Sequence, residues 1–187
     1  MKNEDKRQIV HIVLLALAFL LKYLSHWQAA GLLLFLVVLT IYLVPRLKIK
    51  SYFYRRHEQK YSQGAILYFL ILLILVFIFP LYIVAASWAV LALGDGAATL
   101  IGKNFKVKEL PWNRGKSYIG SLSFVVFGTL GAYLLLRWMA PPINPDIFLS
   151  ASFKTAVVAA VVESLPIKLN DNVSVALTSA VVLTFLI

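Results

Sequence analysis

The sequence predicts an all-α integral membrane protein, a helical bundle of about seven transmembrane helices whose N-terminus is cytoplasmic. Of its 187 residues, 61% are hydrophobic and 14% are charged, whereas an ordinary soluble domain has about 25% charged residues. A soluble fold needs more polar residues to cover its surface, and a disordered chain needs fewer apolar ones. Length and composition together indicate one membrane domain over residues 1–187.

Uncharged stretches define the expected spans, because a helix needs about 20 apolar residues to cross a bilayer. The uncharged run 61–94 is too long for one helix at about 1.5 Å per residue, so we expect two helices hinged at Pro80. A signal peptide is the alternative for the first span, but no small-residue cleavage site follows it, and we expect a retained helix. The expected spans are about 8–24, 28–45, 64–79, 81–101, 118–138, 147–165 and 172–187.

Basic residues set the expected orientation. The net charge is +10, from 18 basic and 8 acidic residues, and the bases gather at the N-terminus and in segments 46–63 and 103–117. These three regions share one side if the spans alternate, and the positive-inside rule makes that side cytoplasmic. We therefore expect a protein of the inner cell membrane that contacts anionic headgroups rather than nucleic acid. Aromatic residues among the bases of 46–63 predict an amphipathic helix on the inner leaflet.

Three carboxylates are expected to meet at the cytoplasmic ends of the spans. Asp95 ends the longest uncharged run, Glu163 closes the sixth span and Asp171 opens the seventh. Ionisable residues within spans are costly and are functional candidates by default, although a solvated helix end is the alternative for each. Carboxylates there could hold Mg²⁺, and the bases of 103–117 could hold phosphates. Lys154, inside the sixth span, is expected to snorkel.

Small residues recur beside these polar groups. They form one helical stripe with a spacing of four residues and a second face at the start of the fifth span. Such faces allow another helix or a ligand to approach closely, and plain helix packing is the alternative. The first stripe is Gly94, Ala98 and Gly102, and the second is Ser117, Gly120, Ser121, Gly128 and Gly131. The absence of cysteine excludes disulfides, thiolate zinc sites and cysteine nucleophiles.

Four sequence blocks together resemble a known family. Arg7 to His11 is similar to an Arg-Lys-x-x-His start, with Gln8 in place of the usual Lys. Gly94-Asp95-Gly96-Ala97-Ala98 through Gly102 is similar to G-D-x-x-A-x-x-x-G, and Lys103 follows where Arg is common. The third block combines Pro111-Trp112-Asn113, which is similar to P-x-N, with Lys116 to Ser121, which is similar to K-S-x-x-G-S. The fourth block, near the C-terminal end of the motif set, consists of Glu163 and Asp171-Asn172. The chain thus resembles the polyprenol kinases, a membrane family that includes dolichol kinase, phytol kinase and CTP-dependent diacylglycerol kinase.

The resemblance implies phosphoryl transfer from CTP or another nucleoside triphosphate to a membrane lipid alcohol, such as phytol, farnesol or a polyprenol. It implies catalytic roles for Asp95 and Lys116, and Mg²⁺ held by Asp95, Asp171 and Glu163. The implied nucleotide and phosphate contacts are Lys103, Asn113, Arg114, Lys116, Ser117, Gly120, Ser121 and Asn172. The remaining residues of the family motifs are Arg7, His11, Gly94, Gly96, Ala98 and Gly102.

Two other functions stay open at this point. Phosphatidate cytidylyltransferases are related to the family, so nucleotidyl transfer to a lipid phosphate is the first alternative. A transporter is the second alternative. A transporter would carry charges near the midplane of the bilayer and internal sequence repeats, whereas here the charges gather at one interface of the membrane. The expected partners are the bilayer, a nucleotide and a prenyl alcohol, and a homodimer is left open.

Overall fold

The computed structural model describes residues 3–47, 52–54, 61–105, 108–139, 144–167 and 169–187. Within these residues the chain forms seven continuous helical stretches and one short β-hairpin. In chain order the elements are α1 (Asn3–Leu14), η1 (Leu15–Tyr23), α2 (His26–Tyr42), η2 (Val44–Arg46), α3 (Gln63–Ile78), α4 (Leu81–Ala89), η4 (Val90–Asp95), α5 (Gly96–Asn104), β1 (Glu109–Leu110), β2 (Asn113–Ser117), α6 (Tyr118–Met139), α7 (Pro145–Ser164) and α8 (Asp171–Leu186).

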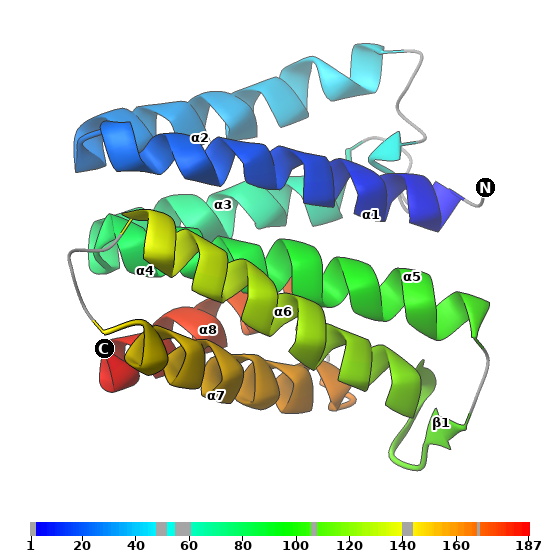
Figure 1. The fold of residues 1–187 in the computed structure, drawn as a ribbon. Coiled ribbons are helices and arrows are strands. Elements are labelled where there is room, and N and C mark those ends of the chain that lie inside the picture. The colour runs from blue at the N-terminus through cyan, green and yellow to red at the C-terminus, as the bar shows by residue number, and fades with distance from the viewer. Residues whose placement is uncertain (1–2, 48–51, 55–60, 106–107, 140–143, 168) are drawn as a thin grey trace.

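The helices lie roughly along one direction, and successive helical stretches run in opposite senses (Figure 1). As a result the N-terminus lies at the end of the bundle that carries the hairpin, and the C-terminus lies at the opposite end (Figure 1). The predicted all-α class is confirmed for the described part of the chain. The hairpin at 109–117 differs from the basic loop that the sequence predicts for 103–117, because strands this short leave no clear sequence signal.

Local sequence signals explain where several helices begin. Ser25 and Gln28 form a capping box before α2, in which each side chain accepts a hydrogen bond from the other residue's backbone N–H. Pro80 separates α3 from α4, as the sequence predicts, because proline lacks the N–H that an uninterrupted helix needs. The side chains of Asn144 and Asn170 accept backbone hydrogen bonds that start α7 and α8.

The central element is the continuous helix Leu81–Asn104, made of α4, η4 and α5. In an 18-residue apolar stretch of this helix 83% of the residues are buried, a larger share than in the other membrane-length helices of the described chain. The middle part, η4, is a π-helix that ends at Asp95. Wider turns of this kind insert an extra residue into a helix and are frequent at functional sites. The polar residue Asp95 therefore lies at a local irregularity of the most buried helix.

Small residues bring α6 against this central helix. A Cβ atom added at Gly131 would lie 3.2 Å from Ala89 Cβ and 3.3 Å from the Ala89 carbonyl oxygen, closer than ordinary contacts, so the glycine allows a close approach of the two helices. Nearer the hairpin, a Cβ at Gly102 would lie 3.3 Å from Gly120 Cα. The two small-residue faces predicted from the sequence therefore pack against each other, and helix packing explains the glycines.

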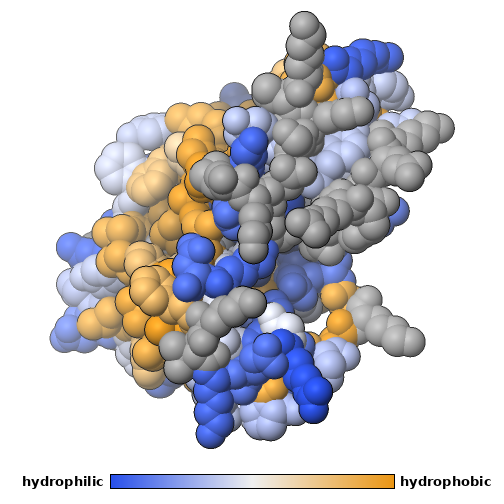
Figure 2. Space-filling model, turned by 90° about the vertical axis from the view of Figure 1, so that its right-hand side faces the viewer, coloured by the Kyte–Doolittle hydropathy of each residue, from blue (hydrophilic) through white to orange (hydrophobic). Residues whose placement is uncertain are grey.

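Four helices are long and apolar enough to cross a membrane: His26–Arg46, Leu81–Asn104, Tyr118–Met139 and Pro145–Ser164. The helices Gln63–Ile78 and Asp171–Leu186 are apolar but shorter. Hydrophilic residues cover much of the hairpin end, and hydrophobic residues lie along one flank (Figure 2). The fold is therefore that of a helical membrane protein. The amphipathic helix predicted within 46–63 falls mostly outside the described residues.

Candidate active site

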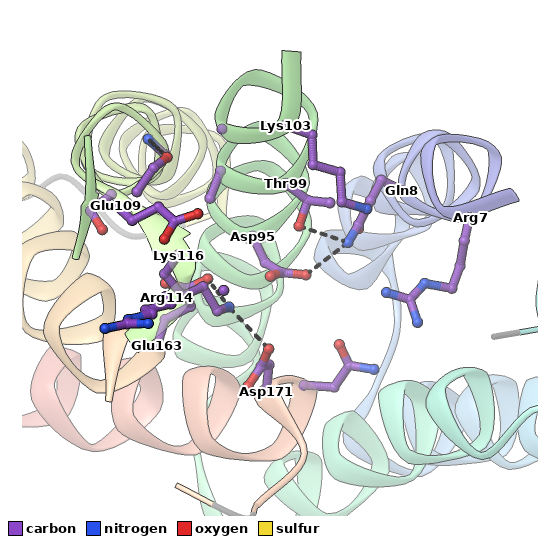
Figure 3. Close-up of a pocket in the computed structure, with 17 residues that line it drawn as sticks. Arg7, Gln8, Asp95, Thr99, Lys103, Glu109, Arg114, Lys116, Glu163 and Asp171 are labelled. Carbon is purple, nitrogen blue, oxygen red and sulfur yellow. Dashed lines mark hydrogen bonds and ion pairs between the residues drawn. The ribbon is translucent and has the colours of Figure 1, made fainter. Parts of the chain in front are cut away.

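A polar cavity of about 490 Å³ lies at the hairpin end of the bundle. Its walls come from α1, α5, the hairpin, the start of α6, the end of α7 and the start of α8, so it joins segments that are far apart in the sequence (Figure 3). The predicted site residues that line it are Arg7, Asp95, Ala98, Gly102, Lys103, Arg114, Lys116, Ser117, Gly120, Ser121, Glu163, Asp171 and Asn172.

Three carboxylates meet inside this cavity. One oxygen each from Asp95, Glu163 and Asp171 lies within 4.8 Å of the other two. Asp95 is 6% exposed and Glu163 is 3% exposed, so both are largely removed from solvent. Carboxylate oxygens are the ligands that Mg²⁺ prefers, and these three are close enough together to hold one ion. The donor set therefore fits the metal that the family resemblance implies.

Lys116 lies directly against two of these carboxylates. Its Nζ atom donates hydrogen bonds to Glu163 Oε1 and, across 3.2 Å, to Asp171 Oδ2 (Figure 3). Burial lowers the pKa of the Lys116 ammonium, but the carboxylates of Glu163, Asp171 and Asp95 raise it, and the net pKa lies above its usual value. Lys116 is therefore a permanent positive charge at neutral pH.

Gln8 orients Asp95 from the N-terminal helix. Gln8 is 1% exposed, and its Nε2 atom donates to Asp95 Oδ2 across 3.3 Å and to Thr99 Oγ1 across 3.1 Å (Figure 3). Because the Asp95 carboxylate can only accept, the amide nitrogen of Gln8 must face it. The amide is a neutral donor, so this bond holds one oxygen of Asp95 in place without adding a charge to the cavity.

The start of α6 forms the wall of the cavity beside the hairpin. Ser117 Oγ accepts a hydrogen bond from the Gly120 N–H across 3.2 Å. A Cβ at Gly120 would lie 3.1 Å from the Ala98 carbonyl oxygen, so glycine is needed for this close approach of α5 and α6. Free backbone N–H groups and the helix dipole favour anions at such a helix start. Lys103 and Arg114 line the same cavity and add positive charge.

Four predicted site residues do not line the cavity. Asn113 joins the hairpin to α7 instead, because its Nδ2 donates to the Ser164 carbonyl oxygen across 3.1 Å. His11 stacks on Tyr68 with ring centroids 4.4 Å apart. Gly94 and Gly96 lie where a Cβ would come within 2.9 Å of Phe124 and Ile12, respectively. These residues therefore support the site by packing and by positioning the hairpin.

Three polar residues of the cavity were not predicted as site residues: Gln8, Thr99 and Glu109. Gln8 was noted only as a departure from the family motif. Thr99 lies one helical turn after Asp95, and that spacing of four residues could have identified it. Glu109 is in β1, and no sequence signal indicated the strand. Lys154 lines a separate cavity with Asp146 and does not contribute to this one.

Comparisons with known proteins add three named relatives. A probable phytol kinase of Triticum aestivum is 31% identical over 144 residues, which are 72% of this chain and 47% of that protein. Phytol kinase 1 of Arabidopsis thaliana is 36% identical over 99 residues, 50% of this chain and 33% of that protein. Farnesol kinase of the same plant is 34% identical over 95 residues, 48% of this chain and 31% of that protein. All three are named as chloroplastic.

The chain spans less than half the length of these relatives. No family model matches it, and no solved structure matches it either. The fold and the cavity define a helical membrane protein with a charged pocket at one end of the bundle. Within that class the chain is a homologue of the phytol and farnesol kinases, which confirms the resemblance to the polyprenol kinase family.

Proposed function

We propose that this protein is a membrane kinase that transfers a phosphoryl group from a nucleoside triphosphate to a lipid alcohol, with a prenol such as phytol or farnesol as the acceptor. One observation carries the proposal. The sequence blocks that resemble the polyprenol kinases come from five separate helices and the hairpin, and their charged residues line a single cavity. Phosphoryl transfer needs such an arrangement, because its catalysis consists of positioning and charge stabilisation.

The cavity offers separate groups for metal and phosphate. Asp95, Glu163 and Asp171 would hold Mg²⁺, which neutralises negative charge on the phosphates during transfer. Lys103 and Arg114 supply cations for the triphosphate, and Arg can bind phosphate oxygens in a bidentate manner. Lys116, Ser117, Gly120 and Ser121 complete the phosphate side, and Asn172 lines the same cavity. CTP is the donor that the family resemblance favours.

Asp95 is the group that we assign to the acceptor alcohol. Gln8 holds its Oδ2, which leaves the other carboxylate oxygen to accept a hydrogen bond from the hydroxyl and orient it toward the phosphate. The cavity is lined by the hairpin and by the helix ends beside it, so the site lies toward the hairpin end of the bundle. A prenol whose tail lies in the bilayer carries its hydroxyl at the interface, which is the depth of this cavity.

We further propose that all seven helical stretches cross the inner cell membrane, with the hairpin end in the cytoplasm. The alternating directions of the helices and the opposite positions of the two termini support this topology (Figure 1). The described bases of segment 103–117, which are Lys103, Lys108, Arg114 and Lys116, lie at the same end as the N-terminus, as the positive-inside rule requires. At the other end, the Lys22 ammonium lies 4.3 Å from the centre of the Trp138 ring, a pairing that suits a membrane interface.

The test is a transfer assay with purified protein in detergent or nanodiscs. Labelled CTP or ATP is incubated with Mg²⁺ and a panel of alcohols that includes phytol, farnesol and longer polyprenols. We expect a labelled prenyl phosphate and release of the nucleoside diphosphate. Release of pyrophosphate with a lipid phosphate as acceptor would instead establish nucleotidyl transfer, and the absence of transfer to every alcohol would refute the proposal.

A further inference from the structure

Lys116 lies where a divalent cation would bind. Its ammonium donates to Glu163 Oε1 and to Asp171 Oδ2, and both carboxylates belong to the cluster with oxygens within 4.8 Å of one another. The ammonium of Lys116 therefore already neutralises charge on the carboxylates of Glu163 and Asp171, in the position that a metal ion would otherwise take.

A metal ion and this ammonium compete for the same oxygens. Two cations within a few ångströms repel each other, and the repulsion is strong where the surroundings are poor in water. Glu163 is 3% exposed and the Lys116 side chain is 24% exposed, so solvent screens the pair only in part. The Lys116 ammonium therefore opposes metal binding at the cluster for as long as it stays there.

The neighbourhood of Lys116 provides a place for the ammonium to go. Lys116 is in β2, between Arg114 and Ser117, and all three line the wall that we assign to phosphates. A lysine has a flexible four-carbon stem and three rotatable donors. Rotation of the side chain alone would transfer the ammonium from the carboxylates to a bound phosphate.

The backbone of the hairpin does not need to move for this exchange. Trp112 Nε1 donates to Ser164 Oγ across 3.3 Å, and Asn113 Nδ2 donates to the Ser164 carbonyl oxygen across 3.1 Å. These two bonds hold the hairpin against the end of α7, next to Glu163. The exchange therefore needs a change only in the Lys116 side chain.

We propose that Lys116 is an internal counter-cation that weakens metal binding at Asp95, Glu163 and Asp171 until a polyphosphate binds and withdraws it. The metal then enters together with the phosphates, not before them. This inference rests on the proposed function only for the identity of the polyphosphate, which there is a nucleoside triphosphate. The competition between ammonium and metal is a property of the free protein.

The experiment measures binding of Mn²⁺, a spectroscopic substitute for Mg²⁺ at oxygen ligands, to the full chain in detergent without nucleotide. Electron paramagnetic resonance of free Mn²⁺ gives the affinity. We expect Lys116→Met to bind Mn²⁺ at least about tenfold more tightly than the wild type, because one opposing charge is removed from a partly buried site. Lys116→Arg keeps the charge and should stay near the wild type.

Two further variants make the result specific. Lys108→Met removes an exposed cation that does not line the cavity, and it should leave Mn²⁺ affinity unchanged. Adding Glu163→Gln to Lys116→Met should abolish the gain, which places the ion at the carboxylates. If Lys116→Met does not fold, Lys116→Gln makes the same test with a neutral side chain that can still donate a hydrogen bond.

The outcomes are separable from those of the transfer assay. Unchanged Mn²⁺ affinity in the neutral variants, or an equal gain in Lys116→Arg, would overturn the counter-cation role even if the wild type phosphorylates prenols. A gain confined to the neutral variants would support it, and a wild type that transfers no phosphate would then refute only the proposed kinase activity.

Discussion

Gln8 Nε2 donates a hydrogen bond to Asp95 Oδ2 across 3.3 Å, and this bond joins the N-terminal helix to the most buried helix of the bundle. The same nitrogen donates to Thr99, so the amide is fixed by two acceptors on one face of the central helix. The first segment of the chain therefore takes part directly in the cavity, although 87 positions separate Gln8 from Asp95.

Replacement of Gln8 by Leu should lower kcat by about tenfold to a hundredfold. The change removes a hydrogen bond to a charged carboxylate, and such bonds contribute about 1.5–3 kcal/mol. Transfer assays at saturating nucleotide and alcohol measure the effect. Thr99→Val is the matched variant, because it removes only the second acceptor, and its kcat should fall much less. Equal losses in both variants would contradict a specific role of the bond to Asp95.

Asp95→Asn should abolish prenol phosphorylation, with a loss of about a thousandfold or more, while the protein still inserts and folds. The amide keeps the shape of the side chain and can still accept from Gln8, but it lacks the negative charge that metal binding and alcohol orientation need. Activity is compared with thermal stability in detergent. The control is Asp146→Asn, which lies at the start of α7 and does not line the cavity, and this variant should retain activity. Substantial activity in Asp95→Asn would remove Asp95 from the catalytic assignment.

Arg114→Met should raise the KM for the nucleotide by about tenfold, with little change in the KM for the alcohol. The Arg114 guanidinium lines the cavity from the hairpin, and its proposed role is a charge-assisted contact with phosphate oxygens. Steady-state kinetics with each substrate varied in turn separate the two constants. Arg137→Met removes a similar exposed charge outside the cavity and should leave both unchanged. An equal rise in both KM values would argue for a general structural effect.

Gly131→Ala should destabilise the protein by about 1–3 kcal/mol, the usual cost of overpacking a tight core. The added Cβ would lie 3.2 Å from Ala89 Cβ and 3.3 Å from the Ala89 carbonyl oxygen, in the contact between α6 and the central helix. Gly31→Ala makes the same change on α2, where no atom lies within 4 Å of the new Cβ, so its stability should stay equal or rise slightly. Thermal unfolding in detergent compares the pair, and equal stabilities would refute the tight contact.

Much of this architecture could be predicted from the sequence, because the responsible signals are local. Uncharged runs bounded by charges indicate helices, and Pro80 marks the break between α3 and α4. The cavity carboxylates were found because a charge such as Asp95 is conspicuous in apolar sequence. Residues 103–117 were found as a phosphate-binding candidate from their charge, and most of the predicted contacts in this segment do line the cavity.

The remainder depends on contacts between distant residues, which no local pattern reveals. The hairpin has only short strands and is held by the bonds of Trp112 and Asn113 to Ser164, about 50 positions away. The wider turn at 90–95 has no sequence signature. Asn113 was assigned to the nucleotide because the resemblance places it in a motif, whereas the structure shows it bonded to protein groups on both sides of its amide.

The carboxylate cluster draws one residue from the central helix, one from α7 and one from α8. During synthesis Asp95 is made long before Glu163 and Asp171, so the cluster does not exist until α8 has been made and has packed. A partly inserted chain therefore lacks this centre. Binding of a ligand at the three carboxylates would report completion of the whole bundle, and it could separate fully assembled protein from incomplete insertion products.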